Sequence, residues 1–303
     1  MAKVNTYEQN AVHKELSDIV SRISPEQTPF LSLIGASSVS NTVYNWAEDQ
    51  LRAVGANAQV EGADAGATTH PQLIEHTGYT QIFAGTVNVS GSAAINSIAG
   101  KNELARQRMN EAAALKLDME HAFVGTAQAA AAGTASAARK TGSFQSQLDS
   151  SVVTDLAKAA ITEDDIADIL TTLYENGGTP TMIMCHPRIK RYLSKVLLVD
   201  KISDVGNEDK LKVSMGVTRY VGDFGAVDIV PNRLCRYDST EKVGDILVID
   251  PAMWEVVTYR EWKKDPLAKT GDSIREQILC EKGLKNRNFK GSGLLTNVGI
   301  TKA

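Results

Sequence analysis

The stretch that decides the fold runs from residue 43 to residue 90, where two β-rich segments flank a long run of small and polar residues. Residues 43–46 read VYNW, residues 55–67 read GANAQVEGADAGA, and residues 80–90 read TQIFAGTVNVS. β-branched and aromatic residues favour strands, whereas glycine and small polar residues favour loops. The pattern predicts a β-hairpin with a long tip, whose two strands are residues 43–46 and 80–90.

A hairpin of this length is too long to lie wholly within a compact body. A strand of about 20 residues reaches roughly 66 Å, whereas a compact chain of this size has a radius of gyration of about 19 Å. We therefore expect the hairpin to project, with strand edges free to pair with another chain. Trp46 lies on this hairpin, so we expect its aromatic side chain to pack at a subunit interface.

A long amphipathic helix is predicted downstream of the hairpin, over residues 101–132, with a pattern that loosens from Gly125 onward. Apolar residues recur there at three- and four-residue spacing, and charged residues fill most of the remaining positions. The apolar positions are Ala105, Met109, Ala112, Leu115, Met119 and Ala122. About 25 residues at helical rise make a rod of roughly 38 Å. The alanine-rich residues 129–138 then predict a surface loop.

The first 40 residues are predicted to form an arm. A helical pattern covers residues 10–20, after which Pro25 and Pro29 forbid helix at and before their positions. An arm with few apolar residues has little of its own to pack on, so we expect it to dock on the body or on a neighbouring chain.

Residues 161–245 have the pattern of an α/β lobe. Thr162 suits a helix N-cap, residues 182–185 read as a buried strand, and Pro187 suits the first turn of a second helix. The remaining residues, 246–303, are rich in strand-forming segments.

The composition is that of a folded protein and limits its possible partners. The chain has 303 residues, 43% hydrophobic and 22% charged, with 32 basic and 36 acidic residues and a net charge of −4. A mildly acidic chain is not built around a phosphate-binding surface. The three cysteines are far apart and odd in number, which favours a reducing compartment over a disulfide framework. No apolar run is long enough to span a bilayer, and no secretory signal is expected.

No catalytic, cofactor-binding or metal site is predicted. Cys185 and His186 are adjacent, but neighbours on a strand point to opposite faces, so a buried thiol beside a strand-end histidine is favoured over a nucleophile–base pair. Glu61, Asp64 and His70 could hold a metal, but they lack a fixed ligand spacing, and a solvated loop is favoured. The chain is therefore not expected to be an enzyme or to bind a cofactor.

Several short motifs resemble one known family, the tailed-phage major capsid proteins with the Hong Kong 97-type fold. Their order and spacing agree over residues 16–293. The motifs are ISPEQTPFL at 23–31, NAQVEGAD at 57–64, YTQIF at 79–83, VNVSGS at 87–92, PLAKTGD at 266–272 and QIL at 277–279.

The resemblance implies an α+β fold with five consecutive parts. They are an N-terminal arm at 1–40, an extended β-hairpin loop at 41–85, a peripheral domain with a long spine helix at 86–160, an α/β axial domain at 161–245, and the C-terminal strands of the peripheral domain at 246–303. No long charged N-terminal scaffolding region is visible, which implies a separate scaffolding protein. No crosslinking residues are carried over.

The function implied is structural. The resemblance implies a subunit that self-assembles into pentamers and hexamers of an icosahedral phage head, enclosing double-stranded DNA without sequence-specific binding. Its expected partners are copies of itself, a scaffolding protein, a portal and a decoration protein, with no membrane; it would be assembled in the host cytoplasm and reside in the virion. Two alternatives remain open: an encapsulin-like compartment shell enclosing a cargo enzyme, and an unrecognised α/β enzyme. The expected assembly-interface residues are Phe30, Trp46, Arg52, Glu61, Asp64 and Phe83.

Overall fold

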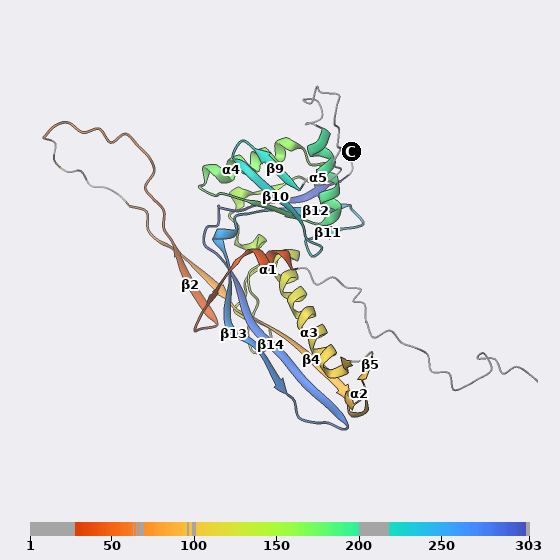
Figure 1. The fold of residues 1–303 in the computed structure, drawn as a ribbon. Coiled ribbons are helices and arrows are strands. Elements are labelled where there is room, and N and C mark those ends of the chain that lie inside the picture. The colour runs from red at the N-terminus through yellow and green to blue at the C-terminus, as the bar shows by residue number, and fades with distance from the viewer. Residues whose placement is uncertain are drawn as a thin grey trace, which may run out of the picture. The chain divides into compact units, whose positions relative to one another are not determined.

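The structure, a computed structural model, describes residues 28–62, 64, 66, 70–95, 97–98, 101–199 and 218–300 (Figure 1). The helix predicted at residues 10–20 and most of the predicted arm lie outside these residues. The chain divides into two compact units, which are described separately. The main unit comprises Gln27–Phe83, Lys116–Lys263 and Leu279–Ala303, and the small unit includes Ala84–Leu115 and Lys264–Ile278.

A seven-stranded mixed sheet forms the α/β part of the main unit. Its strands run in the order β7 (Val153–Asp155), β15 (Gly293–Gly299), β12 (Val243–Ile249), β8 (Met182–Cys185), β10 (Gly225–Pro231) and β9 (Arg219–Gly222), and β11 (Tyr237–Asp238) pairs with β12. β8 pairs with β10 in parallel and with β12 in antiparallel register. Every residue of β12 is buried, so this strand lies at the centre of the fold.

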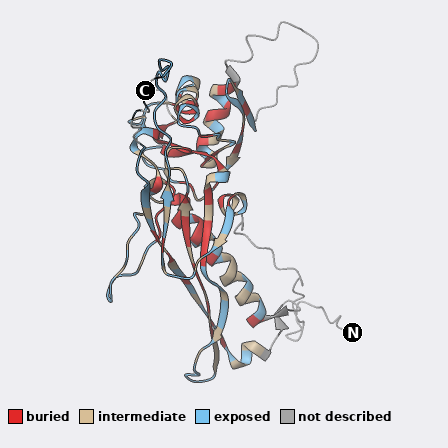
Figure 2. Cartoon of the chain, turned by 90° about the vertical axis from the view of Figure 1, so that its left-hand side faces the viewer, coloured by how far each residue is buried: buried red, intermediate tan, exposed pale blue. Residues whose placement is uncertain are grey.

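Two helices, α4 (Glu163–Glu175) and α5 (Pro187–Val199), belong to the same lobe. Their apolar residues share one core cluster with Ile183 and Cys185 of β8, which lie on one face of the sheet because side chains alternate along a strand. Thr162 caps α4 as predicted, in a capping box in which it and Asp165 bond each other's backbone N–H. Figure 2 shows the buried residues gathered in these strands and helices.

A second sheet has four strands in the order β1 (Gly35–Ser38), β13 (Trp254–Pro266), β14 (Ser273–Asn286) and β4 (Gln81–Ser90). The long helix α3 (Glu103–Glu120) continues into a π-helical turn at His121–Gly125, so the predicted helix is confirmed as far as Gly125 and ends there. Within the main unit, Phe30, Phe144 and Trp254 pack ring against ring, with centroids 4.6–6.2 Å apart. Short 3-10 turns lie at Gln145–Gln147, Ser150–Val152 and Pro251–Met253.

The small unit contains the ends of these long elements together with short ones. The short elements are α2 (Gly91–Ile95), β5 (Ser97–Ile98) and β6 (Lys101–Asn102). An ion pair joins its α3 and β14 segments: Arg108 Nε lies 2.5 Å from Glu276 Oε2, and Nη2 donates to Oε1 at 2.6 Å. A two-point pair of this kind fixes the orientation of both side chains.

The predicted return strand of the hairpin is wrong. The strand β2 (Val43–Glu48) pairs in antiparallel register with β3 (Ile74–Tyr79), and β4 lies in the four-stranded sheet. β3 reads IEHTGY, with three polar residues in a row, so it lacks the alternating apolar pattern that marks a half-buried strand. At the junction, Thr80 N–H donates to Thr42 O at 3.0 Å, where the chain leaves one sheet for the other.

The predicted boundary at residue 245 also needs correction. It falls inside β12, and β15 of the predicted 246–303 segment lies in the seven-stranded sheet with it. Both strands are apolar and buried, so they complete the core of the α/β lobe. The segment 246–303 is therefore shared between the two large sheets.

Candidate assembly interface

The hairpin formed by β2 and β3 carries a long exposed loop, residues 49–73, that begins after Glu48 (Figure 1). All described residues of this loop are exposed and form neither helix nor strand. Four of them are large and apolar, and they are 65–103% exposed: Leu51, Val54, Val60 and Leu73. Apolar side chains exposed to this extent gain free energy when another surface buries them.

Tyr44 fixes the base of the hairpin to the chain's own body. Its hydroxyl donates to Leu284 O at 2.8 Å, and its ring is buried. Two glycines make room for it: a Cβ at Gly78 or at Gly283 would lie 2.5 or 2.6 Å from Tyr44 atoms. Burial raises the pKa of the Tyr44 hydroxyl, which stays protonated as a donor.

A second set of aromatic contacts surrounds Trp46. Its ring stacks on Tyr44 and on Phe289, with centroids 5.7 and 6.4 Å away, and Lys285 Nζ lies 5.8 Å from its centroid. His76, across the strand pair, stacks on Phe289 at 4.0 Å and contacts Glu48 Oε2 at 2.9 Å. These contacts make the hairpin base stiff while the loop beyond it stays exposed.

A buried carboxylate fixes the first described helix, α1 (Pro29–Leu33). The side chain of Glu120 accepts hydrogen bonds from Phe30 N–H at 2.8 Å, Leu31 N–H at 2.9 Å and Asn232 Nδ2 at 2.7 Å. Glu120 has no exposed surface, and desolvation raises its pKa despite the three donors. The point at which the arm joins the body is thus held by α3.

A second buried carboxylate, Glu281, fixes the junction between β3 and β4. It accepts hydrogen bonds from Thr80 Oγ1 at 2.6 Å and Arg260 Nε at 2.8 Å, and it pairs with Arg139. Arg139 Nε also donates to Thr80 O at 2.6 Å. Thr80 is thus bonded by both Glu281 and Arg139, and these contacts hold the junction against the four-stranded sheet.

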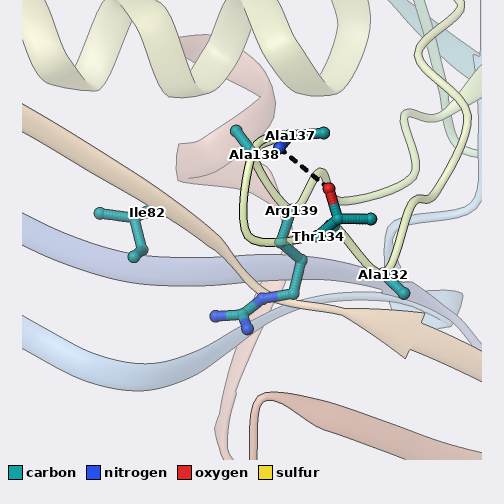
Figure 3. Close-up of a pocket in the computed structure, with 7 residues that line it drawn as sticks. Ile82, Ala132, Thr134, Ala137, Ala138 and Arg139 are labelled. Carbon is teal, nitrogen blue, oxygen red and sulfur yellow. Dashed lines mark hydrogen bonds between the residues drawn. The ribbon is translucent and has the colours of Figure 1, made fainter.

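A hollow of about 360 Å³ lies where the alanine-rich loop passes β4 (Figure 3). Ile82 lines it from β4 and is 52% exposed, and Ala132, Ala138 and Arg139 line it from the loop. Thr134 Oγ1 accepts a hydrogen bond from Ala137 N–H at 3.1 Å, which closes the loop's turn. The hollow is open to solvent, and its lining mixes small apolar residues with Thr134 and Arg139.

The six expected interface residues fall into three environments. Arg52, Glu61 and Asp64 are exposed on the hairpin loop. Phe30 and Phe83 are buried core residues, at 0% and 6% exposure, so neither side chain offers a surface to a neighbour. Trp46 is half-buried against its own chain, because Phe289 and Lys285 lie against its ring. Nothing in the sequence indicated these two contacts.

Sequence reasoning missed several positioning residues: Tyr44, His76, Glu120, Glu281 and Phe289. Tyr44 could have been found, because it shares a strand face with Trp46 at the two-residue spacing. The partners of Glu120 lie 89–112 residues away in the chain and those of Glu281 lie 21–201 residues away, and no local pattern signals them.

The adjacent residues Cys185 and His186 are shielded by burial and by ring stacking. Cys185 is fully buried, and burial raises the pKa of its thiol to about 12. His186 stacks on Tyr237 at 4.7 Å, and burial lowers its pKa. Among the described residues no cluster of three or more His, Cys, Asp or Glu side chains could hold a metal. In that same part of the chain, no helix is long and apolar enough to cross a membrane.

Comparison with solved structures identifies the fold. The capsid of an empty GTA particle has a TM-score of 0.69 and 12% identity, covering 98% of this chain and 100% of that one. Mycobacterium phage Cain has a TM-score of 0.65 and 12% identity, covering all of both chains. The encapsulin of the holo-SrpI complex from Synechococcus elongatus PCC 7942 has a TM-score of 0.65 and 11% identity, covering 100% and 98%. The expected Hong Kong 97-type fold is confirmed.

Comparison of sequences identifies the family. The major capsid protein of Escherichia phage Phieco32 is 24% identical over 347 residues, which cover 96% of this chain and 95% of that protein. The SU10 major capsid protein family matches residues 3–299. The chain therefore belongs to the SU10 major capsid protein family and is a structural capsid protein of a phage virion.

Proposed function

We propose that this capsid subunit assembles into pentamers and hexamers, which close an icosahedral head around double-stranded DNA. The observation that carries the proposal is the exposed loop 49–73 on a stiff base. Tyr44 and Trp46 hold its base to the body, whereas Leu51, Val54 and Val60 have no cover in the described part of the chain. Such a loop is better placed to pack against a neighbouring subunit than against its own subunit.

The energetics favour many modest contacts. Burying one Val or Leu side chain contributes about 1.5–3 kcal/mol, and part of this is lost to ordering the loop. A single loop contact is therefore weak, but closing a ring or shell makes each further contact intramolecular and strengthens the whole. Repetition of one head-to-tail contact closes a ring when its rotation fits.

The exposed polar residues of the loop, Arg52, Glu61 and Asp64, belong to the same proposed contact surface. Trp46 would support that surface from its base, and Phe30 and Phe83 would act only through the core. We further propose a separate scaffolding protein, a portal, a decoration protein and assembly in the host cytoplasm. The five-part division of the chain stays part of this proposal, with β7, β12 and β15 reassigned to the axial lobe.

The test replaces the apolar side chains of the loop. The variant Leu51→Ser/Val54→Ser/Val60→Ser should keep the circular dichroism of the wild type and lose most particles in sedimentation and negative-stain microscopy. A matched control, Ala53→Ser/Ala56→Ser/Ala58→Ser, changes the same loop and should assemble normally. Normal particles from the first variant would contradict the role of the loop.

The alternative of a cargo compartment rests on the fold shared with the Synechococcus encapsulin. Particle contents separate the two functions. The proposal expects double-stranded DNA in particles made during infection, whereas an enclosed enzyme without DNA would favour the compartment.

A further inference from the structure

The two helices of the α/β lobe carry opposite charges. α4 reads EDDIADILTTLYE, with five acidic and no basic residues. α5 reads PRIKRYLSKVLLV, with four basic and no acidic residues. Both helices pack on the same core cluster of the main unit, and Figure 1 shows them as two separate helices of this lobe. One lobe therefore carries an anionic and a cationic helix.

Part of this charge serves the fold itself. Asp165 closes the capping box of α4, and Glu163 Oε1 accepts a hydrogen bond from Tyr220 at 3.3 Å. Lys190 Nζ donates to Ile229 O at 2.7 Å, and the Arg188 guanidinium lies 5.5 Å from the centre of the Tyr237 ring. These four side chains are therefore partnered within their own chain.

The remaining charges form one stripe on each helix. Asp164, Asp168 and Glu175 are exposed and lie within about 40° of one another around the α4 axis, at helical spacing. Arg191 and Lys195 are exposed one turn apart on α5. Within the residues that the structure describes, these five side chains form no ion pair, either between the two helices or elsewhere.

An apolar patch lies beside the anionic stripe. Tyr174 precedes Glu175 and packs on Phe224, with ring centroids 4.9 Å apart, and the two rings are 57% and 45% exposed. They border a hollow of about 200 Å³ that Leu170, Pro180 and Val227 also line. An exposed aromatic pair with a charged rim has the anatomy of a protein–protein contact.

We propose that the α4 stripe of one copy docks on the α5 stripe of the next copy, with Tyr174 and Phe224 in the apolar centre of the contact. Opposite charges on one chain make a head-to-tail contact that repeats with every added copy, which is the requirement for a ring. Two copies joined through the same stripe would instead bring like charges together. This inference rests on the proposed assembly into rings, and it names the surface through which neighbouring copies join head to tail.

The test uses charge reversal, with compensation as its control. Asp168→Lys/Glu175→Lys alone, and Arg191→Glu/Lys195→Glu alone, should each lower the yield of capsomers at least tenfold in sedimentation velocity. The chain carrying all four reversals keeps the wild-type net charge and restores complementarity, so it should assemble again. The two variants when co-expressed should alternate, and so should form rings with an even number of copies, such as hexamers. Exposed substitutions of this kind leave stability nearly unchanged, which circular dichroism checks.

Several outcomes would overturn the inference. Assembly by either reversed variant alone would do so, as would failure of the four-fold variant to recover while folded. Normal assembly of the α5 variant with weakened binding to double-stranded DNA would instead assign the cationic stripe to nucleic acid. If a reversed variant unfolds, the salt dependence of wild-type capsomers decides: docking through charges should weaken between about 0.05 M and 0.5 M salt, and no change would overturn it. Failure of the wild type to form rings would contradict the proposed function itself.

Discussion

Glu120 and Phe30 lie 90 positions apart in the chain, yet the Glu120 carboxylate accepts the Phe30 backbone N–H at 2.8 Å. This contact joins the end of α3 to the first turn of α1, and both side chains are fully buried. It shows how the subunit fixes its arm and hairpin to the body and still presents an exposed loop. Buried polar contacts fix the places where the arm and the hairpin leave the body, and the hairpin loop itself is left exposed for other copies.

Replacing Glu120 with Gln should lower the free energy of unfolding by about 1–3 kcal/mol, because an amide NH₂ would then face the Leu31 N–H and leave buried donors unsatisfied. Urea unfolding at neutral pH measures the change. Asp118→Asn, at an exposed position of the same helix, is the matched control and should stay within about 0.5 kcal/mol of the wild type. Equal stability of both variants would show that the Glu120 contacts are not needed.

Adding a methyl group at Gly78 should destabilise the hairpin base. A Cβ there would lie 2.5 Å from the Tyr44 ring, so either the ring or the strand must shift, at a cost of about 1–3 kcal/mol. Gly55→Ala is the control, because nothing lies within 4 Å of a Cβ at that position. Thermal unfolding compares the two, and an unchanged Tm for Gly78→Ala would show that Tyr44 is loosely held.

Acid should weaken the ion pair of the small unit. Hydrogen bonds from Arg108 hold the pKa of Glu276 below its ordinary value, so the folded state binds fewer protons than the unfolded chain. The stabilisation is present above the ordinary pKa of a glutamate and is lost as pH falls through the lowered one. The stability difference between wild type and Glu276→Gln should therefore shrink as pH falls in a series of urea titrations.

The control for that series is Glu261→Gln, because the Glu261 side chain is 77% exposed and lies 3.7 Å from Lys282. The stability of this variant should stay within about 0.5 kcal/mol of the wild type, as expected of a substitution at an exposed side chain. A Glu276 difference that stayed constant or grew towards acid pH would contradict the assignment.

Replacing Trp46 with Ala should reduce particle yield more than it reduces the folded fraction of the subunit. The ring stacks on Phe289 and Tyr44 at the hairpin base, so its loss frees the hairpin from the body while the two main sheets keep their cores. Sedimentation velocity and circular dichroism measure the two effects. Loss of soluble folded subunit together with the particles would instead make Trp46 a core residue.

Local patterns could predict the parts of the fold that local forces determine. The capping box at Thr162, the periodicity of α3 and the apolar runs of β8, β10 and β12 all mark their own elements. β3 could not be found this way, because it reads IEHTGY and its polar residues Glu75, His76 and Thr77 follow one another instead of alternating with apolar residues. The sheet that each strand joins is likewise decided by distant partners, as the pairing of β12 with β8 and β15 shows.

The candidate interface could be predicted only in outline. The glycine-rich tip reads directly as an exposed loop, so Arg52, Glu61 and Asp64 lie where the sequence places them. Phe30 and Phe83 are apolar residues in short segments, and nothing local separates a docking residue from a core residue there. Their burial depends on Phe144, Trp254 and Phe123, which the chain brings in from far away.

The most direct test of the central claim is cryo-electron microscopy of assembled particles, at a resolution that traces residues 49–73. The account predicts that this loop lies on an adjacent subunit, with Leu51, Val54 and Val60 buried in that contact. A loop folded back on its own subunit, or one that touches no neighbour in a closed shell, would contradict it.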